Sequence, residues 1–137
     1  MSRLKRFSVS IEQDLLTRFD RHIEEAGYPT RSKAITDLIT DDLVAGDWKS
    51  GREVAAAIVM VYDHHRRNLS DRLTHIQHDH HDIIISTQHI HLDHDNCLEI
   101  VVVRGDPEGV GVLADRLRAT KGVKYCSVAA ASTGVGL

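Results

Sequence analysis

The sequence predicts an α+β fold in two parts, a strand followed by two helices (βαα) and then a βαββαβ domain. Residues 6–11 alternate polar and apolar side chains, and two stretches with helical spacing follow them. Beyond residue 54, strand-like and helix-like stretches succeed one another in the order βαββαβ. We therefore expect domains at residues 1–46 and 54–137, joined by a linker at residues 47–53 that lacks periodicity.

The N-terminal part begins with a half-buried strand, because strand side chains alternate between two faces. Its apolar face consists of Phe7, Val9 and Ile11. A first helix then runs to Gly27, a typical helix stop, and a second begins after Thr30, a suitable N-cap. These elements span only about 45 residues, too few to bury a core alone, so we expect this part to dimerise.

The C-terminal part follows the pattern of a split βαβ, ferredoxin-like fold. Its apolar periodicity predicts four strands and two helices. In chain order these are a strand at 54–62, a helix at 67–79, strands at 83–92 and 97–104, a helix near 110–121 and a strand at 123–131. A tight turn joins the second and third strands, which we expect to pair as an antiparallel hairpin.

Composition and charge narrow the classes of protein. The chain has no apolar run long enough to span a membrane, and its basic, alternating N-terminus is unlike a signal segment, so we expect a cytoplasmic protein. Two cysteines in 137 residues are too few for a disulfide scaffold. The net charge of -3 does not favour nucleic-acid binding, but Arg3, Lys5 and Arg6 all precede the first acidic residue.

A candidate metal site lies in the predicted hairpin. His89 and His91 are two residues apart and therefore share one face of a strand. If the hairpin folds symmetrically about His94, Cys97 lies beside His91 on that same face. Two imidazoles and a thiolate suit a transition metal. With a third imidazole they suit Ni(II) or Cu(II) in a planar array and Zn(II) in a tetrahedron.

Three ligands on one sheet face leave a fourth position open. The preceding helix and its end supply the nearest candidates, in this chain or in another subunit: His75, His78, His80 and His81. His64 and His80 are candidates for weaker secondary sites, and Glu99, opposite His89, for a hydrogen bond that orients an imidazole. His22, His65 and His94 are interpreted as solvated surface residues, and Cys126 as a small core residue.

The N-terminal part has features that suit DNA binding. A strand that pairs with its copy in a dimer makes a two-stranded ribbon that can enter a major groove. Its outward side chains, Arg6, Ser8 and Ser10, would face base edges. The amino end of the second helix, with Arg31, Ser32 and Lys33, would bind phosphate.

Both halves resemble the nickel-responsive transcriptional regulator (NikR) family over nearly the whole chain. The matching motifs are Arg6-x-Ser8-x-Ser10, Gly27-Tyr28, Arg31-Ser32-x-Ala34-Ile35, Tyr62-x-His64, Gln77-His78-x-His80-His81-Asp82 and His89-x-His91-x-x-His94-Asp95-x-Cys97-Leu98-Glu99-Ile100. The resemblance implies a ribbon-helix-helix DNA-binding domain and an ACT-like domain that binds metal and forms a homotetramer, a dimer of dimers. It also implies one Ni(II) per chain, bound by His89, His91, Cys97 and His78 of a neighbouring subunit.

The chain departs from the family at three positions. Ser8 and Ser10 stand where members often have threonine on the DNA-facing strand. Lys33 stands where they commonly have a glutamate that helps bind a cation between the domains, although Asp37 still matches an acidic position. Lys33 also removes the capping-box partner of Thr30.

We therefore expect a nickel-dependent repressor of nickel-uptake genes that binds operator DNA. Two alternatives share the same residues: a sensor of copper or cobalt on this scaffold, and a histidine-rich nickel storage or chaperone protein. A metalloenzyme is disfavoured, because four protein ligands would leave no open coordination position and no nucleophile–base pair is recognisable.

Overall fold

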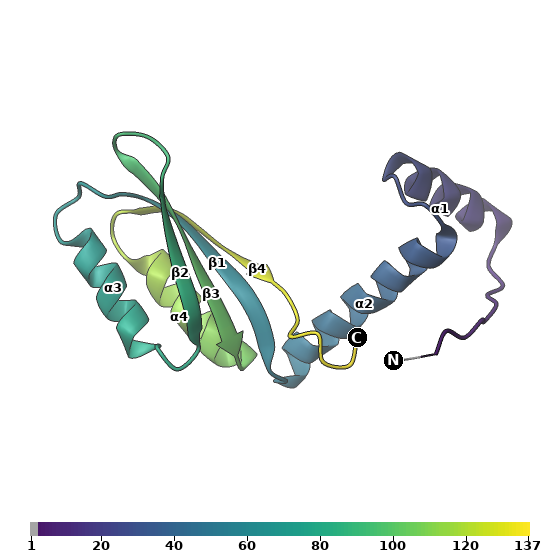
Figure 1. Cartoon of the computed structure of the whole chain (residues 1–137). Helices are drawn as coiled ribbons and strands as arrows, with labels where there is room; N and C mark the ends of the chain where they lie inside the picture. The colour runs from purple at the N-terminus through teal and green to yellow at the C-terminus, as the bar shows by residue number, and fades with distance from the viewer. Residues whose placement is uncertain (1–2) are drawn as a thin grey trace. The chain divides into compact units, whose positions relative to one another are not determined.

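The computed structural model describes residues 3–137, which divide into two compact units at Asp41 and Asp42 (Figure 1). The first unit contains helix α1 (Gln13–Glu25) and the start of helix α2 (Arg31–Ser50). The second contains the end of α2 and all the strands. No helix in the described range is both long and apolar enough to cross a membrane.

The turn between α1 and α2 follows from two predicted residues. Gly27 has a φ of +79°, and Tyr28 N donates to Ile23 O at 2.9 Å while Gly27 N donates to Glu24 O at 3.1 Å. This pair of bonds is a Schellman motif, which favours glycine because of its left-handed backbone. Thr30 Oγ1 then accepts from Lys33 N at 3.1 Å, which confirms the predicted N-cap of α2.

The predicted strand at residues 6–11 is wrong for the isolated chain, where residues 3–12 form neither helix nor strand. Phe7 and Val9 are 69% and 61% exposed. A strand needs a neighbour for its backbone hydrogen bonds, and a single copy of this segment has none. The apolar residues Leu15, Leu38 and Ile39 of the two helices are exposed as well.

The predicted linker at residues 47–53 is also mostly helical, because α2 continues to Ser50. Gly51, with a φ of +78°, follows its last residue. Gly46 lies within the helix; this costs roughly 1 kcal/mol relative to alanine but does not end it. In the second unit, Trp48 Nε1 donates to Ala131 O at 2.9 Å and holds the end of α2 against the residue that follows the last strand.

The second unit is the predicted βαββαβ domain. Its elements are β1 (Val54–Asp63), α3 (Leu69–Asp79), β2 (Ile84–His91), β3 (Asn96–Gly105), α4 (Pro107–Ala119) and β4 (Val123–Ala130). The antiparallel sheet has the order β2-β3-β1-β4, so β2 and β4 are its edges. Asp106 Oδ1 accepts from Gly109 N at 2.7 Å and, with Pro107, starts α4 earlier than its apolar stripe indicated.

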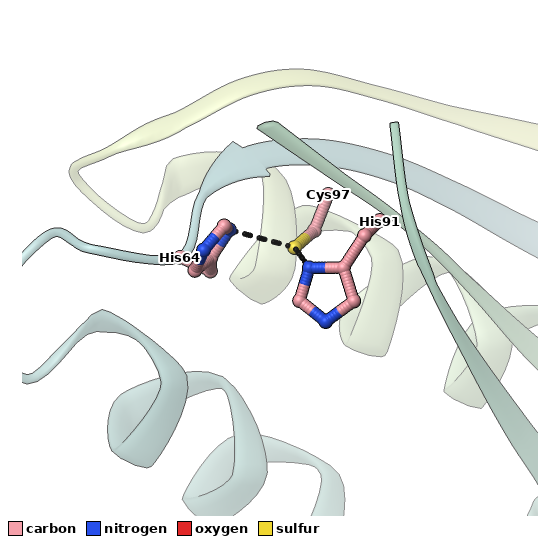
Figure 2. Close-up of side chains that lie close together, drawn as sticks. All are labelled: His64, His91 and Cys97. Atoms are coloured by element: carbon pink, nitrogen blue, oxygen red, sulfur yellow. Dashed lines mark hydrogen bonds between the residues drawn. The ribbon is translucent and has the colours of Figure 1, made fainter. Parts of the chain in front are cut away.

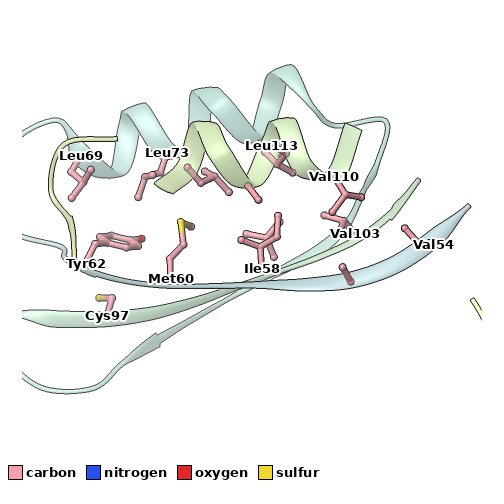
Figure 3. Close-up of a cluster of buried hydrophobic side chains, with 14 residues drawn as sticks. Val54, Ile58, Met60, Tyr62, Leu69, Leu73, Cys97, Val103, Val110 and Leu113 are labelled. Atoms are coloured by element: carbon pink, nitrogen blue, oxygen red, sulfur yellow. The ribbon is translucent and has the colours of Figure 1, made fainter. Parts of the chain in front are cut away.

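The core lies between one face of this sheet and the helices α3 and α4 (Figure 3). Alternate residues of β1, from Val54 through Ile58 to Tyr62, are buried on that face. Leu73 of α3 and Leu113 of α4 are buried against them. The face that carries Tyr62 therefore also carries its cross-strand neighbours on β3.

Leu113→Ala is expected to destabilise the C-terminal unit by about 2–5 kcal/mol, because it removes a fully buried side chain and leaves a cavity. Val112→Ala is the matched control on the same helix, since Val112 is 47% exposed. Urea unfolding followed by circular dichroism measures both free energies. Equal losses for the two variants would contradict this packing.

Candidate metal centre

The β2–β3 hairpin has the predicted register. His91 lies opposite Cys97, and His89 lies opposite Glu99. Cys97 also pairs with Tyr62 of β1, and Glu99 pairs with Met60. Directly paired residues share a face of a sheet. The hairpin side chains His89, His91, Cys97 and Glu99 are therefore all on the helix-covered face. Since β2 is an edge strand, the site lies at the border of that face.

Cys97 lies between His64 and His91 in a cluster of possible metal ligands (Figure 2). Its Sγ lies 3.1 Å from His64 Nδ1 and 3.6 Å from His91 Nδ1, and the thiol is fully buried. His64 comes from the loop after β1, where its backbone N donates to Asp95 O at 3.1 Å. One donor atom from each of these three residues lies within 4.8 Å of the other two. A soft sulfur and two imidazole nitrogens are thus already convergent.

The surroundings of this cluster disfavour charge on the Cys97 thiol and on the His64 imidazole. Burial, followed by the negative charges of Glu99, Asp63 and Asp93, raises the pKa of the Cys97 thiol. Burial, followed by the neighbouring His65 and His91, lowers the pKa of His64. The thiol therefore keeps its proton at neutral pH, and the His64 imidazole keeps a free lone pair for that proton or for a metal.

We expect nickel affinity to rise about tenfold for each pH unit between pH 6 and 8, because binding must release the proton that the raised pKa leaves on Cys97. Competition titrations with a chelator of known proton affinity measure this slope. In Cys97→Ser the thiol contribution should disappear from the slope. A slope of zero in the natural chain would show that no thiol proton is displaced.

His89 stands beside this cluster and is held by other partners. Its Nδ1 lies 3.2 Å from Tyr62 Oη and 3.4 Å from Glu99 Oε1. Its ring centroid is 5.1 Å from that of His91. Since Nδ1 is engaged, Nε2 is the nitrogen of His89 that remains for a metal.

Glu99 organises the side chains behind the metal candidates. Although only 7% exposed, its carboxylate accepts from Tyr62 Oη at 3.3 Å and from Gln77 Nε2 at 2.8 Å. Thr87 Oγ1 in turn donates to Gln77 Oε1 at 2.9 Å. Burial and the Glu99 charge raise the pKa of Tyr62, so its hydroxyl stays a donor. This network connects α3 to all three neighbouring strands and fixes the orientation of His89.

Glu99→Gln is expected to weaken nickel binding about tenfold, because loss of the carboxylate frees the His89 ring. It should also lower the pKa of Tyr62, which a spectroscopic phenol titration measures. Glu53→Gln is the control, since Glu53 pairs with Arg104 on the surface at 2.6 Å. Unchanged nickel affinity in Glu99→Gln would show that the hydrogen bonds of Glu99 do not support nickel binding.

The helix and its end do not deliver a fourth ligand to Cys97 within one chain. In residues 3–137 the cluster around Cys97 contains no residue of α3. The His78 and His81 rings are 5.9 Å apart, and His81 Nδ1 lies 3.0 Å from His78 O. His75 Nε2 lies 3.9 Å from Asp79, and His80 Nε2 lies 3.0 Å from Arg116 Nη1.

The predicted DNA-facing residues are exposed. Arg6, Ser8 and Ser10 lie in the extended N-terminal segment. Arg31 forms a two-pronged ion pair with Asp20 at 2.8 and 2.7 Å. The remaining exposed residues at the start of α2 are Ser32 and Lys33.

Lys33 has its own partner at the expected cation position. Its Nζ lies 2.5 Å from Asp37 Oδ1, and this bond lowers the pKa of the Asp37 carboxyl. The Lys33 ammonium group thus balances the negative charge of the Asp37 carboxylate.

The sequence predicted His64 only as a candidate for a weaker secondary site and His65 as a solvated surface residue. His64 lies nearer to Cys97 than His89 does, and His65 lies close to His94 and Asp95 in a second cluster. Both depend on the loop after β1 folding against the hairpin turn. The sequence signal for that contact is weak, since only the density of histidines hints at it.

The fold and the site define a metal-binding protein whose sequence holds a two-helix unit and then a ferredoxin-like domain. Residues 55–131 match the NikR C terminal nickel binding domain. A nickel-responsive regulator of Chlorobium limicola is 49% identical, and the match covers 98% of this chain and 100% of that protein. One of Syntrophus aciditrophicus is 50% identical, and the match covers 98% of each chain. One from Desulfovibrio desulfuricans is 48% identical over 100% of the chain and 99% of its own.

The chain therefore belongs to the NikR family of nickel-responsive regulators, which is not a class of enzymes. The uncharacterized protein TM1266 from Thermotoga maritima shares the fold, with a TM-score of 0.53 and 14% identity. That similarity covers 58% of this chain and 98% of the other. Family membership assigns nickel binding to the C-terminal domain, residues 55–131, and a regulatory role to the chain.

Proposed function

We propose that this chain is a cytoplasmic nickel-responsive regulator that binds operator DNA and represses nickel-uptake genes when Ni(II) is bound. The observation that carries the proposal is the pairing of His91 with Cys97, which sets a thiol and imidazoles on one face of the hairpin. Nickel accepts such mixed nitrogen and sulfur ligands readily. The family assignment selects nickel among the metals that the ligands suit.

The proposed nickel ligands are His89, His91 and Cys97 of one chain and His78 of a neighbouring subunit, with one ion per chain. Within the chain, His78 lies outside the Cys97 cluster, which supports its service to another subunit. His64 Nδ1 lies within hydrogen-bond distance of the Cys97 thiol. Entry of nickel would release that contact and take the thiolate.

The DNA-binding unit would be a dimer. The exposed apolar side chains of the N-terminal segment, Phe7, Val9 and Ile11, need a partner strand to cover them. Pairing with the same segment of a second copy buries them and leaves Arg6, Ser8 and Ser10 outward, toward base edges. Two such dimers, joined through the C-terminal domains, make the proposed tetramer.

Thermodynamic linkage couples the binding of nickel to the binding of operator DNA. Nickel that bridges subunits favours one arrangement of the DNA-binding dimers, and operator DNA that prefers the same arrangement tightens nickel binding by the same factor. Repression at high nickel is the expected output.

Selection from a random DNA pool tests the proposal and identifies an operator sequence in the same experiment. The full chain is incubated with the pool at one equivalent of Ni(II), and in parallel with one equivalent of Co(II), with one equivalent of Cu(II) and with a chelator. We expect enrichment of a sequence with two related half-sites only in the nickel sample. Enrichment with Co(II) or Cu(II) alone would identify another metal, and no enrichment at all would favour storage.

A further inference from the structure

The C-terminal end of α3, which carries the proposed ligand His78, is attached to the rest of the domain on both sides of that residue. The first attachment is Gln77, directly before His78. Its Nε2 donates to Glu99 Oε2 at 2.8 Å, and its Oε1 accepts from Thr87 Oγ1 at 2.9 Å. His78 itself is exposed, so its imidazole is accessible from outside the chain.

The second attachment is Arg116 of α4, the helix that packs beside α3 on the same face of the sheet (Figure 1). Its guanidinium reaches the two residues directly after His78. Nη2 lies 3.3 Å from Oδ2 of Asp79, the last residue of α3, and Nη1 lies 3.0 Å from Nε2 of His80, its C-cap. Because a guanidinium has only donors, His80 Nε2 accepts and the imidazole proton is on Nδ1.

The last turn of α3 is the part of the helix that most needs such support. Its backbone bonds run from His80 N to Gln77 O at 3.1 Å and from His81 N to His78 O at 3.3 Å. Helix ends fray because their final carbonyl groups lack partners within the helix. Arg116 binds two consecutive residues with one planar group, a geometry that a lysine ammonium does not supply. It therefore restrains the turn whose fraying would displace His78.

We propose that Arg116 is a positioning residue for nickel binding: by holding Asp79 and His80, it keeps the His78 imidazole in the orientation that binds the nickel ion of a neighbouring subunit. This inference rests on the proposed role of His78 as a ligand. A ligand that is ordered before the ion arrives loses less conformational entropy on binding, and the difference appears as nickel affinity. The same guanidinium engages the lone pair of His80 Nε2, so this nitrogen does not compete with His78 for the ion.

Arg116→Gln is expected to weaken Ni(II) binding to the full chain about fivefold, the upper end of what an exposed ion pair contributes. Removal of a positive charge near a bound cation would by itself strengthen binding, so a weaker affinity reports the lost contacts. Chelator competition titrations measure the affinity. Arg118→Gln is the matched control on the same helix, since Arg118 contacts Asp115 at 3.2 Å and the carbonyl of Cys126 at 3.5 Å. Equal losses in the two variants would overturn the proposal.

A double-mutant cycle with His78→Gln separates positioning of His78 from a general structural effect. If Arg116 acts through His78, Arg116→Gln should change the nickel affinity less than twofold in the His78→Gln background. The sulfur-to-nickel absorption band is a second readout. At saturating Ni(II), Arg116→Gln should keep the band of the natural chain because His78 still binds, whereas His78→Gln should shift it because a ligand is lost.

The cycle also distinguishes failure of this inference from failure of the proposed ligand set. If His78→Gln weakens nickel binding but Arg116→Gln does not, or if Arg116→Gln weakens it equally in both backgrounds, His78 remains a ligand and the positioning role is wrong. If His78→Gln leaves both the affinity and the band unchanged, His78 is not a ligand and the positioning role falls with it.

Discussion

Cys97→Ser is expected to abolish the sulfur-to-nickel absorption band and to weaken nickel binding about a hundredfold or more. The substitution replaces the soft sulfur at the centre of the cluster with a hard oxygen that does not ionise near neutral pH. Because serine is close to cysteine in size, the buried position should stay filled and the domain folded. Nickel titration followed by absorption spectroscopy, with circular dichroism for the fold, measures both effects.

Cys126→Ser is the matched control, since it removes the other thiol of the chain. Cys126 lies on β4, where burial also raises the pKa of its thiol, but its Sγ contacts Ala114 O instead of histidines. The band should therefore persist in this variant. A band that remains in Cys97→Ser, or one that vanishes in Cys126→Ser, would move the nickel site away from the hairpin.

Arg6→Ala is expected to remove specific DNA binding while nickel affinity stays unchanged. An arginine that forms two hydrogen bonds with guanine contributes about 1–3 kcal/mol to discrimination, and a dimer would lose two such contacts. Gel-shift titrations with the selected operator and with random DNA, each at saturating Ni(II), measure the loss. We expect the operator affinity to fall toward that for random DNA.

Arg18→Ala controls for the loss of positive charge. Arg18 is exposed on α1, outside the segment proposed to read bases. Its removal should weaken binding to operator DNA and to random DNA to a similar, small extent. If Arg6→Ala had only this uniform effect, Arg6 would contact phosphate and not a base edge.

The hairpin could be predicted from the sequence because its geometry is local. Side-chain alternation puts His89 and His91 on one face, and a turn centred on His94 brings Cys97 opposite His91, as the structure confirms. The helices of the C-terminal domain followed from apolar spacing for the same reason. Only a few residues separate the partners in each case.

Features that depend on other segments or other chains were harder to predict. The strand expected at residues 6–11 cannot form without a second copy. The length of α2 was missed because Gly46 and the lack of periodicity suggested a loop, while Trp48 gains a hydrogen bond to the distant Ala131. The position of His64 beside Cys97 depends on a bond from its backbone to Asp95, which no local pattern reveals.

The place of β2 at the edge of the sheet has a consequence for local motion. An edge strand has hydrogen-bonded neighbours on one side only, and His89 and His91 lie on this strand while Cys97 lies on β3. A bound ion would therefore join the two strands near their turn and suppress fraying of the outer one. Amide hydrogen exchange along residues 84–91 would then report metal occupancy strand by strand, independently of any optical signal.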